Sequence, residues 1–310
     1  MRAAVVRFVG GPDNVEVVDV AIPDPGLAQV RIKVQAAALN PVDAGVWSGV
    51  FGPPQAGDRL GLGWDVAGTI DATGPMSPIG LGTPVIAMVQ GPVTAVGAQA
   101  EYVVVPANAV APAPAGISAA LASTIPLNGL TAAQSLELLA PRAGGIVMVT
   151  GAAGAVGGYA VELAKNLGLK VVALAGAGDE DFVTSTLGAD WFVPRSDDPV
   201  STVRQLFPDG VDGVLDAALL ANDIMGVVRD GGSYVTVDPR EDATPRPQRG
   251  ITIRTTLAVP DGSRLTTLSD LVAAGRLTPR VAEIYPLSHA SQAHRRLAQG
   301  GLRGRIVLTP

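Results

Sequence analysis

The sequence contains no cysteine and only two histidines, His289 and His294. Without cysteine the chain has no disulfide bonds, no thiolate metal ligands and no cysteine nucleophile. Both histidines fall in one helical pattern near the carboxyl end, and no cluster of histidines and carboxylates accompanies them. We therefore predict that the protein has no metal site.

The chain also lacks basic blocks and long apolar runs. Lysine and arginine total 22 against 28 acidic residues, so the net charge is -6, and we do not expect nucleic acid as a partner. No apolar run reaches the roughly 18 residues that a membrane span needs, so we expect no membrane partner. The opening segment "MRAAVVRFVGGP" reads as a strand and a turn without the cleavage site of a secretory signal, which predicts a cytoplasmic protein.

Two patterns divide the 310 residues, which suffice for two domains with large cores. Residues 1–110 carry short β-branched runs between glycines and prolines, which predicts a compact, barrel-like β domain. From Gly145 onward apolar strands alternate with helical patterns, which predicts a parallel sheet covered on both faces. We expect strands over 145–151, 170–176, 191–194, 213–219, 232–237 and 251–259, and helices over 155–168, 181–188, 199–207, 222–230 and 265–275. The segment 281–310 reads as strand, helix and strand.

Three glycines spaced three apart lie where the strand at 145–151 turns into the helix at 155–168. Missing side chains there let the backbone approach a pyrophosphate, which the amino end of the helix attracts. An ordinary tight turn is the alternative, but the flanking strand, helix and second strand favour dinucleotide binding. The residues expected against the cofactor are Gly151, Ala152, Gly154, Ala155, Val156 and Gly157.

The chain resembles the zinc-independent quinone oxidoreductase family of the medium-chain dehydrogenase/reductase superfamily over nearly its whole length. The matching segments occur in the family's order and include "VQAAALNPVDAGVWSG", "GLGWDVAGTI", "PLNGLTAAQSL", "VTGAAGAVGGYAVELAK", "VDGVLDAA", "DGGSYVTV" and "SQAHRRLAQG". The resemblance implies an α/β protein with a GroES-like, β-rich catalytic domain over 1–117, completed by 277–310. A Rossmann domain with a doubly wound parallel sheet would cover 118–276, and the active site would lie between the two domains.

The resemblance implies an NAD(P)H-dependent oxidoreductase that transfers hydride to a quinone or an activated enone. Trp64 occupies the position at which zinc-dependent relatives carry a histidine ligand in a Gly-His-Glu motif. Two alternatives stay open. One is an enoyl reductase of a biosynthetic pathway, and the other is a protein that binds NADPH without catalysis.

Asn40 and Asp43 of "NPVD" are the candidate catalytic residues by resemblance. The Asn40 amide could bind the nicotinamide or the acceptor carbonyl, whereas an Asn-Pro turn and a helix cap at Asp43 are the structural alternatives. Related enoyl reductases use a tyrosine in this region, but here Trp47 stands in the loop and cannot donate a proton. That departure favours acceptors that water can protonate.

Trp47, Phe51 and Trp64 are candidate walls of the substrate pocket, or ordinary core residues. Thr131 of "NGLTAA" matches a family threonine that reaches the nicotinamide half of the cofactor. Its alternative is a helix threonine bonded to its own preceding turn.

The cofactor choice depends on the tip of the strand at 170–176. An NAD-binding fold usually places an acid there for the ribose 2′-hydroxyl, but this tip reads "LAGAG". Arg195 replaces a family tyrosine and could bind a 2′-phosphate. Asp179, Glu180 and Asp181 would oppose that phosphate if they faced it, or they could cap the next helix. We predict NADP, with NAD as the alternative. The resemblance further implies a homodimer that pairs residues 251–259 with their copy.

Overall fold

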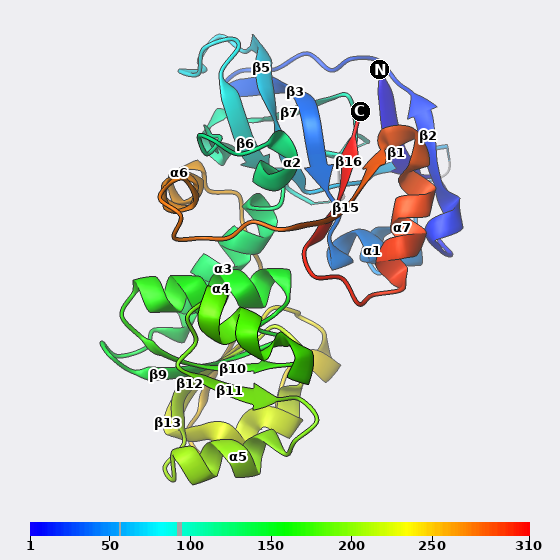
Figure 1. Cartoon of the computed structure of the whole chain (residues 1–310). Coiled ribbons are helices and arrows are strands. Elements are labelled where there is room, and N and C mark those ends of the chain that lie inside the picture. Colours follow the sequence, from blue (N-terminus) through cyan, green and yellow to red (C-terminus); the bar gives the residue numbers. More distant parts are fainter. Residues whose placement is uncertain (56, 92–94) are drawn as a thin grey trace. The chain divides into compact units, whose positions relative to one another are not determined.

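The computed structural model describes residues 1–55, 57–91 and 95–310. The chain divides into two compact units (Figure 1). The first comprises Met1–Leu127, Val259–Gly275 and Pro279–Pro310, and the second comprises Asn128–Ala258 and Arg276–Thr278. Residues 118–127 and 259–275, which the family resemblance places in the Rossmann domain, belong to the first unit.

The first unit is built on two sheets. The larger sheet has the order β15-β16-β3-β5-β6-β8, with β7 paired to β3, and the smaller has the order β2-β1-β4. The strands are β1 (Arg2–Val6), β2 (Val15–Asp19), β3 (Gln29–Ala38), β4 (Leu60–Gly61), β5 (Asp65–Thr73), β6 (Pro84–Met88), β7 (Tyr102–Pro106), β8 (Val110–Pro112), β15 (Val281–Pro286) and β16 (Arg305–Thr309).

Alternating burial explains the central strand of the larger sheet. In β3 the side chains of Val30, Ile32 and Val34 are buried while Lys33 and Gln35 are exposed, as expected for a strand that covers a core with one face. The helices of this unit are α1 (Pro41–Ser48), α2 (Ala119–Ala122), the first two residues of α3 (Pro126–Leu139), α6 (Gly262–Ala273) and α7 (Ala290–Ala298). Helix α6 packs on β8, where the Ser269 hydroxyl donates to the Pro112 carbonyl at 2.8 Å.

The second unit holds a six-stranded parallel sheet in the order β11-β10-β9-β12-β13-β14. The strands are β9 (Ile146–Thr150), β10 (Lys170–Ala175), β11 (Trp191–Pro194), β12 (Val211–Asp216), β13 (Val228–Thr236) and β14 (Thr252–Thr255). Helices α4 (Ala155–Asn166) and α5 (Pro199–Leu206) lie on opposite faces of this sheet (Figure 1). The chain order reverses between β9 and β12, which is where doubly wound sheets bind their ligands. The predicted fold class is confirmed.

Two expected helices differ in the structure. The segment expected to be a helix over 181–188 forms a π-helical turn at Phe182–Thr186. In place of the helix expected over 222–230, a 3₁₀ helix at Ala221–Val227 leads directly into β13. The β-branched pair Val227 and Val228 is fully buried. Packing of these side chains favours a strand from Val228 onward, although the apolar spacing of the segment also suits a helix.

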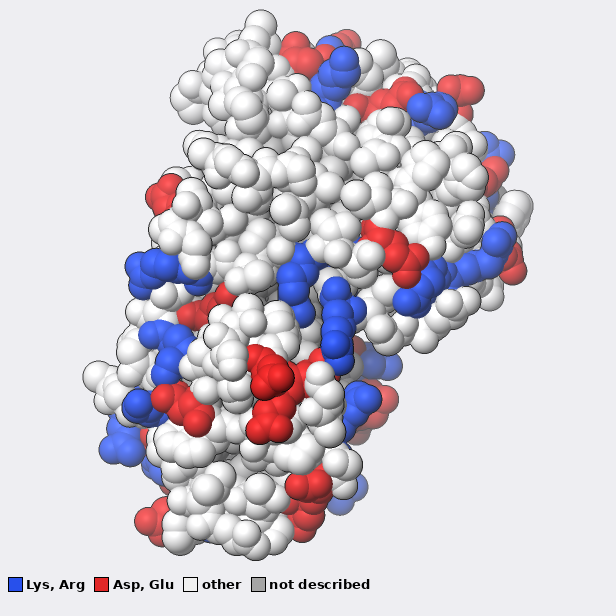
Figure 2. Space-filling model, in the orientation of Figure 1, with Lys and Arg blue, Asp and Glu red and all other residues white. Residues whose placement is uncertain are grey.

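The surface and the helices add two observations. On the face shown in Figure 2, acidic and basic side chains are interspersed, without a broad basic field. Within the described residues, none of the helices combines the length and the apolar character that crossing a membrane requires.

Candidate active site

The glycine turn joins β9 to α4 in the second unit. Gly151 has φ +60°, a conformation that L side chains rarely adopt, and Gly154 is the residue preceding the first turn of α4. A Cβ on Gly157 would lie 2.2 Å from the Gly151 carbonyl oxygen, so only glycine lets the helix approach the turn this closely. A Cβ on Gly154 would meet one atom alone, the same oxygen, at 3.0 Å. The fold therefore requires Gly157, whereas Gly154 leaves space that a ligand can use.

The amino end of α4 suits an anion. The first amide groups of a helix have no partners within it and carry the positive end of its dipole. The first turn of α4 contains no acidic side chain, and no side chain caps the Gly154 end. Ala152 is buried beneath the turn, while Ala155 and Val156 are half-buried in the first helical turn. The turn and the helix end together fit the pyrophosphate of a dinucleotide.

The tip of β10 carries Gly176 in place of an acid, and two charged groups approach it. A Cβ on Gly176 would lie 3.0 Å from the Asp179 Oδ2 atom and 3.8 Å from the Arg195 Nη2 atom. Arg195 follows β11 and is exposed, and its backbone N–H donates to the Ala175 carbonyl at 2.7 Å. Of the three neighbouring acids, Asp181 makes no capping hydrogen bond to the π-helical turn that follows it.

Arg195 is not bound to the acids that follow it in the chain. Asp198 caps α5 by accepting from the N–H groups of Val200 and Ser201, and Asp197 accepts from Ser196. Across residues 1–55, 57–91 and 95–310, the guanidinium of Arg195 makes no ion pair. Its charge is thus available beside the ribose position of the sheet.

A buried carboxylate holds the strand ends beneath the glycine turn. Asp216 ends β12 and is fully buried, and it accepts from the Thr150 hydroxyl at 2.5 Å, from the Tyr234 hydroxyl, and from the Ala221 N–H at 2.9 Å. Burial raises the pKa of Tyr234, and the Asp216 charge adds to that rise. Asp216 is not among the residues expected from the sequence, although it is the only charge within the apolar run 213–219.

Asn40 and Asp43 lie at the start of α1 in the first unit, 1% and 0% exposed. The Asn40 N–H donates to Asp43 Oδ2 at 2.7 Å. The other oxygen, Asp43 Oδ1, accepts from the Gly63 N–H at 2.9 Å and from the Gln99 amide at 3.2 Å. Asp43 therefore makes the capping contact that the sequence analysis gave as its structural alternative.

Asp65, the first residue of β5, adds a second buried carboxylate that the sequence analysis missed. Its Oδ2 atom accepts from the Asn40 side-chain amide at 2.6 Å, and its Oδ1 atom accepts from the Leu127 N–H at 2.6 Å. Burial raises the pKa of both Asp43 and Asp65 to about 7, and the positive charge of Arg305 opposes the rise. Asp65 is the only acid in the quoted segment "GLGWDVAGTI", which was the available signal.

Trp47 and His294 continue this network towards the carboxyl end of the chain. The Trp47 indole N–H donates to His294 Nδ1 at 3.3 Å, so the other ring nitrogen of His294 carries the proton and donates to Gln99 Oε1 at 2.9 Å. His294 is fully buried, and burial lowers its pKa to about 3. Both ring nitrogens of His294 are therefore engaged within the first unit.

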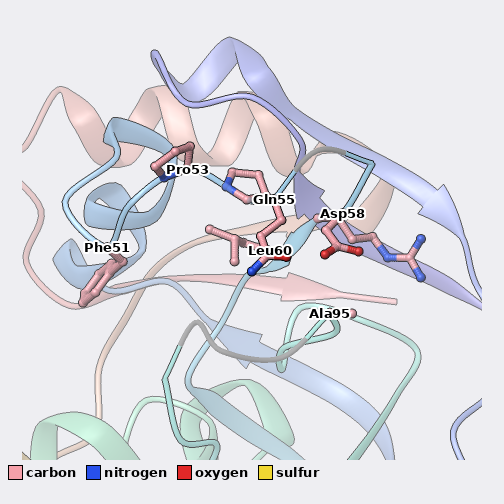
Figure 3. A pocket seen from close by; sticks show the side chains of 8 residues that line it. Phe51, Pro53, Gln55, Asp58, Leu60 and Ala95 are labelled. Atoms are coloured by element: carbon pink, nitrogen blue, oxygen red, sulfur yellow. The ribbon is translucent and has the colours of Figure 1, made fainter.

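The loop between α1 and β4 lines a cavity of about 500 Å³ in the first unit. Figure 3 shows Phe51 at one end of it and Asp58 at the other, with Gln55 and Leu60 between them. Of the three candidate pocket aromatics, Phe51 lines this cavity and Trp47 and Trp64 do not. Trp64 is 5% exposed, and its ring centroid lies 6.3 Å from that of Phe51.

Two features remain to be placed, the candidate cofactor contact Thr131 and any side chains that could ligate a metal. Thr131 lies in the part of α3 that belongs to the second unit and is 8% exposed. Within the described ranges no group of three or more histidine, cysteine, aspartate or glutamate side chains is placed to hold a metal ion.

Comparison with known proteins covers both units. The model of the alcohol dehydrogenase GroES-like domain matches residues 26–115, and that of the zinc-binding dehydrogenase domain matches residues 187–308. The quinone oxidoreductase of Lama guanicoe is 30% identical over 327 residues, covering 99% of this chain and 97% of that protein. The NADPH-dependent alkenal/one oxidoreductase of Arabidopsis thaliana chloroplasts is 29% identical, covering 100% of this chain and 80% of that protein. A solved NAD-dependent alcohol dehydrogenase is 31% identical, with a TM-score of 0.88 and both chains fully covered.

Proposed function

Because the chain belongs to the quinone oxidoreductase family of the medium-chain dehydrogenase/reductase superfamily, we propose that it transfers hydride from NADPH to a quinone or an activated enone without zinc. The glycine turn at β9 and α4 carries the proposal. Gly151 has the left-handed conformation that the turn needs, Gly157 gives the close approach of the helix, and Gly154 leaves room for a pyrophosphate. The N–H groups at the start of α4 would hold that pyrophosphate.

Three observations support NADPH over NADH as the cofactor. The tip of β10 lacks the acid that accepts from a ribose 2′-hydroxyl, and the Arg195 guanidinium lies beside Gly176 instead. A relative that covers the whole chain is named NADPH-dependent. Asp179, which also approaches Gly176, works against a 2′-phosphate, and the similar solved structure is that of an NAD-dependent enzyme. NADH is therefore the alternative cofactor, and dissociation constants for NADPH and NADH distinguish the two.

For hydride transfer the protein mainly has to position the nicotinamide against the acceptor and to stabilise the oxyanion that develops on the acceptor. When bound, the nicotinamide supplies the hydride. The Asn40 amide would hydrogen-bond the nicotinamide or the acceptor carbonyl, and Asp43 would act through Asn40 because its own oxygens are occupied by three donors. Thr131 would contact the nicotinamide half of the cofactor. The Trp47 indole N–H is already bound to His294, which favours acceptors that water protonates.

The proposal that zinc is not needed depends on the side chains of the chain. Zinc sites of this superfamily use thiolates and imidazoles. The sequence has no cysteine, and the imidazole of His294 is engaged by Trp47 and Gln99. His289 is exposed, next to Ser288.

The experiment that tests the function is anaerobic oxidation of NADPH against quinones, enones and acyl thioesters. We expect turnover with quinones or enones. Because Phe51 lines the cavity of the first unit, we also expect substitutions at Phe51 to change the rate of turnover. Turnover of acyl thioesters alone would instead support the enoyl reductase. Tight NADPH binding without turnover of any acceptor would support a protein that binds the cofactor without catalysis.

A further inference from the structure

We infer that Asp65 is a positioning residue for hydride transfer, because it fixes both the direction of the Asn40 amide and the first turn of α3. This inference rests on the proposed function, in which Asn40 contacts the cofactor or the acceptor. Asp65 itself is fully buried, and its two oxygens accept from Asn40 and Leu127.

The first step concerns the direction of the Asn40 amide. Its nitrogen and oxygen have nearly the same shape, so the hydrogen-bond partners on its two sides decide which of them faces Asp65. An ionised carboxylate accepts and cannot donate, so Asn40 must turn its NH₂ group to Asp65 Oδ2, 2.6 Å away. The amide oxygen then points away from Asp65. A neutral residue at position 65 would remove the constraint on the NH₂ side and leave only the capping-box contact of the Asn40 side chain with the Asp43 N–H.

The second step concerns α3. Pro126 begins this helix and has no N–H, and Leu127 is among the first residues, whose N–H groups lack partners within the helix. Asp65 Oδ1 accepts from Leu127 at 2.6 Å and places negative charge at the positive end of the helix. Thr131 follows Leu127 by four positions and so lies on the same side of α3. One carboxylate thus holds both the candidate catalytic amide and the first turn of α3.

The third step concerns charge. The charged groups that act on Asp65 are Arg305, whose positive charge favours the ionised carboxylate, and Asp43, which carries like charge nearby. Burial opposes ionisation and raises the pKa of Asp65 to about 7. Both hydrogen bonds require acceptors, so they favour the carboxylate over the acid. A protonated Asp65 would offer one acceptor less and would release Asn40 or Leu127.

The test is a double-mutant cycle with Asp65→Asn and Asn40→Ala. Asparagine keeps the size of Asp65 but can accept from only one of the two donors. Loss of a charge-assisted hydrogen bond corresponds to roughly 10- to 100-fold, so we expect Asp65→Asn to lower kcat/KM by that factor. In the Asn40→Ala background the one remaining amide oxygen has only the Leu127 N–H to accept from, so the same substitution should cost less than about threefold. Equal losses in both backgrounds would overturn the inference.

A second measurement needs no activity and separates this inference from the proposed function. In the NMR spectrum, Asp65→Asn should shift the Asn40 side-chain amide signals, assigned by their loss in Asn40→Ala, and should speed hydrogen exchange at the Leu127 amide. These changes are expected even if no acceptor is turned over, an outcome that would contradict the proposed function alone. If Asp65→Asn does not fold, hydrogen exchange in the unsubstituted protein provides the test, and we expect the Leu127 and Asn40 amide protons to be protected. Exchange of the Leu127 and Asn40 amide protons at the rate of exposed amides would overturn the inference.

Discussion

Arg195 lies beside Gly176, with its Nη2 atom 3.8 Å from the position that a Cβ on Gly176 would occupy. The two residues follow adjacent strands, β11 and β10, at the edge of the sheet where an adenosine ribose binds in this fold. A guanidinium thus stands where NAD-binding chains usually place an acid. Asp179 shares the same space, so the two charges oppose each other in their effect on a 2′-phosphate.

Arg195→Ala is expected to weaken NADPH binding and to leave NADH binding almost unchanged. A lost charge-assisted contact costs about 1.5–3 kcal/mol, or roughly 10- to 100-fold in affinity. Dissociation constants for both cofactors, measured by fluorescence titration, check this. Asp179→Asn is the matched control and should strengthen NADPH binding, since it removes the opposing charge. Equal changes for NADPH and NADH in Arg195→Ala would contradict the assignment.

Gly154→Ala is expected to lower cofactor affinity, whereas Gly157→Ala is expected to lower the stability of the fold. Alanine at 154 meets one oxygen at 3.0 Å, so the Tm should change little while cofactor affinity falls roughly tenfold or more. Alanine at 157 would press on the Gly151 carbonyl at 2.2 Å and should lower the Tm itself. Calorimetry with and without NADPH measures both effects. Unchanged cofactor affinity in Gly154→Ala would remove the basis for the pyrophosphate site.

The features of the fold that depend on residues close together in the chain were predictable from the sequence. Strand–turn–helix order, glycine spacing and β-branched runs placed the parallel sheet and its phosphate turn, because each depends on neighbours within a few residues. It missed the buried polar contacts, because these join distant positions. His294 and Gln99 are separated by 195 positions, and Asn40 and Asp65 by 25. One sequence carries no periodic signal for such pairs.

Local spacing was also misleading where tertiary packing decided the outcome. Residues 222–230 carry a helical spacing, but Val227 and Val228 are fully buried where β13 begins next to β12. A Cβ on Gly226 would lie 2.6 Å from the Val200 side chain, so the short 3₁₀ helix packs closely on α5. Burial of β-branched side chains in the sheet outweighs the modest difference in local propensity.

Exhaustive chelation is expected to leave turnover unchanged. The proposed chemistry uses the Asn40 amide for the developing charge and calls on no metal ligand. Steady-state rates after dialysis against a chelator, with metal content measured in parallel, check this prediction. Loss of activity that zinc restores would contradict it.

Thr255→Pro is expected to weaken a homodimer formed through β14. Within the described chain β14 pairs with β13 alone, and Leu257 and Val259 just beyond it are 64% and 52% exposed. The Thr256 N–H donates to Thr236 at 2.9 Å, so the Thr255 N–H points to the open side, and proline there spares the bond to β13. Sedimentation of parent and variant at micromolar concentration measures the effect. A parent protein that sediments as a monomer would contradict the dimer.

The buried His294 is expected to make the protein sensitive to acid. Its pKa is about 3 in the folded chain against 6.5 for the free side chain, so between these values the unfolded chain binds the proton more strongly. The free energy of unfolding should therefore fall as the pH drops from 6.5 towards 3, by up to about 5 kcal/mol from this group. Asp43 and Asp65 act in the opposite direction, because burial raises their pKa values and favours their protonated forms. His294→Gln keeps a donor for Gln99 without the titration, so its stability relative to the parent should rise as the pH falls. Denaturant unfolding of both proteins at pH 7, 6 and 5 measures this difference, and parallel pH dependences would show that His294 does not titrate in this way.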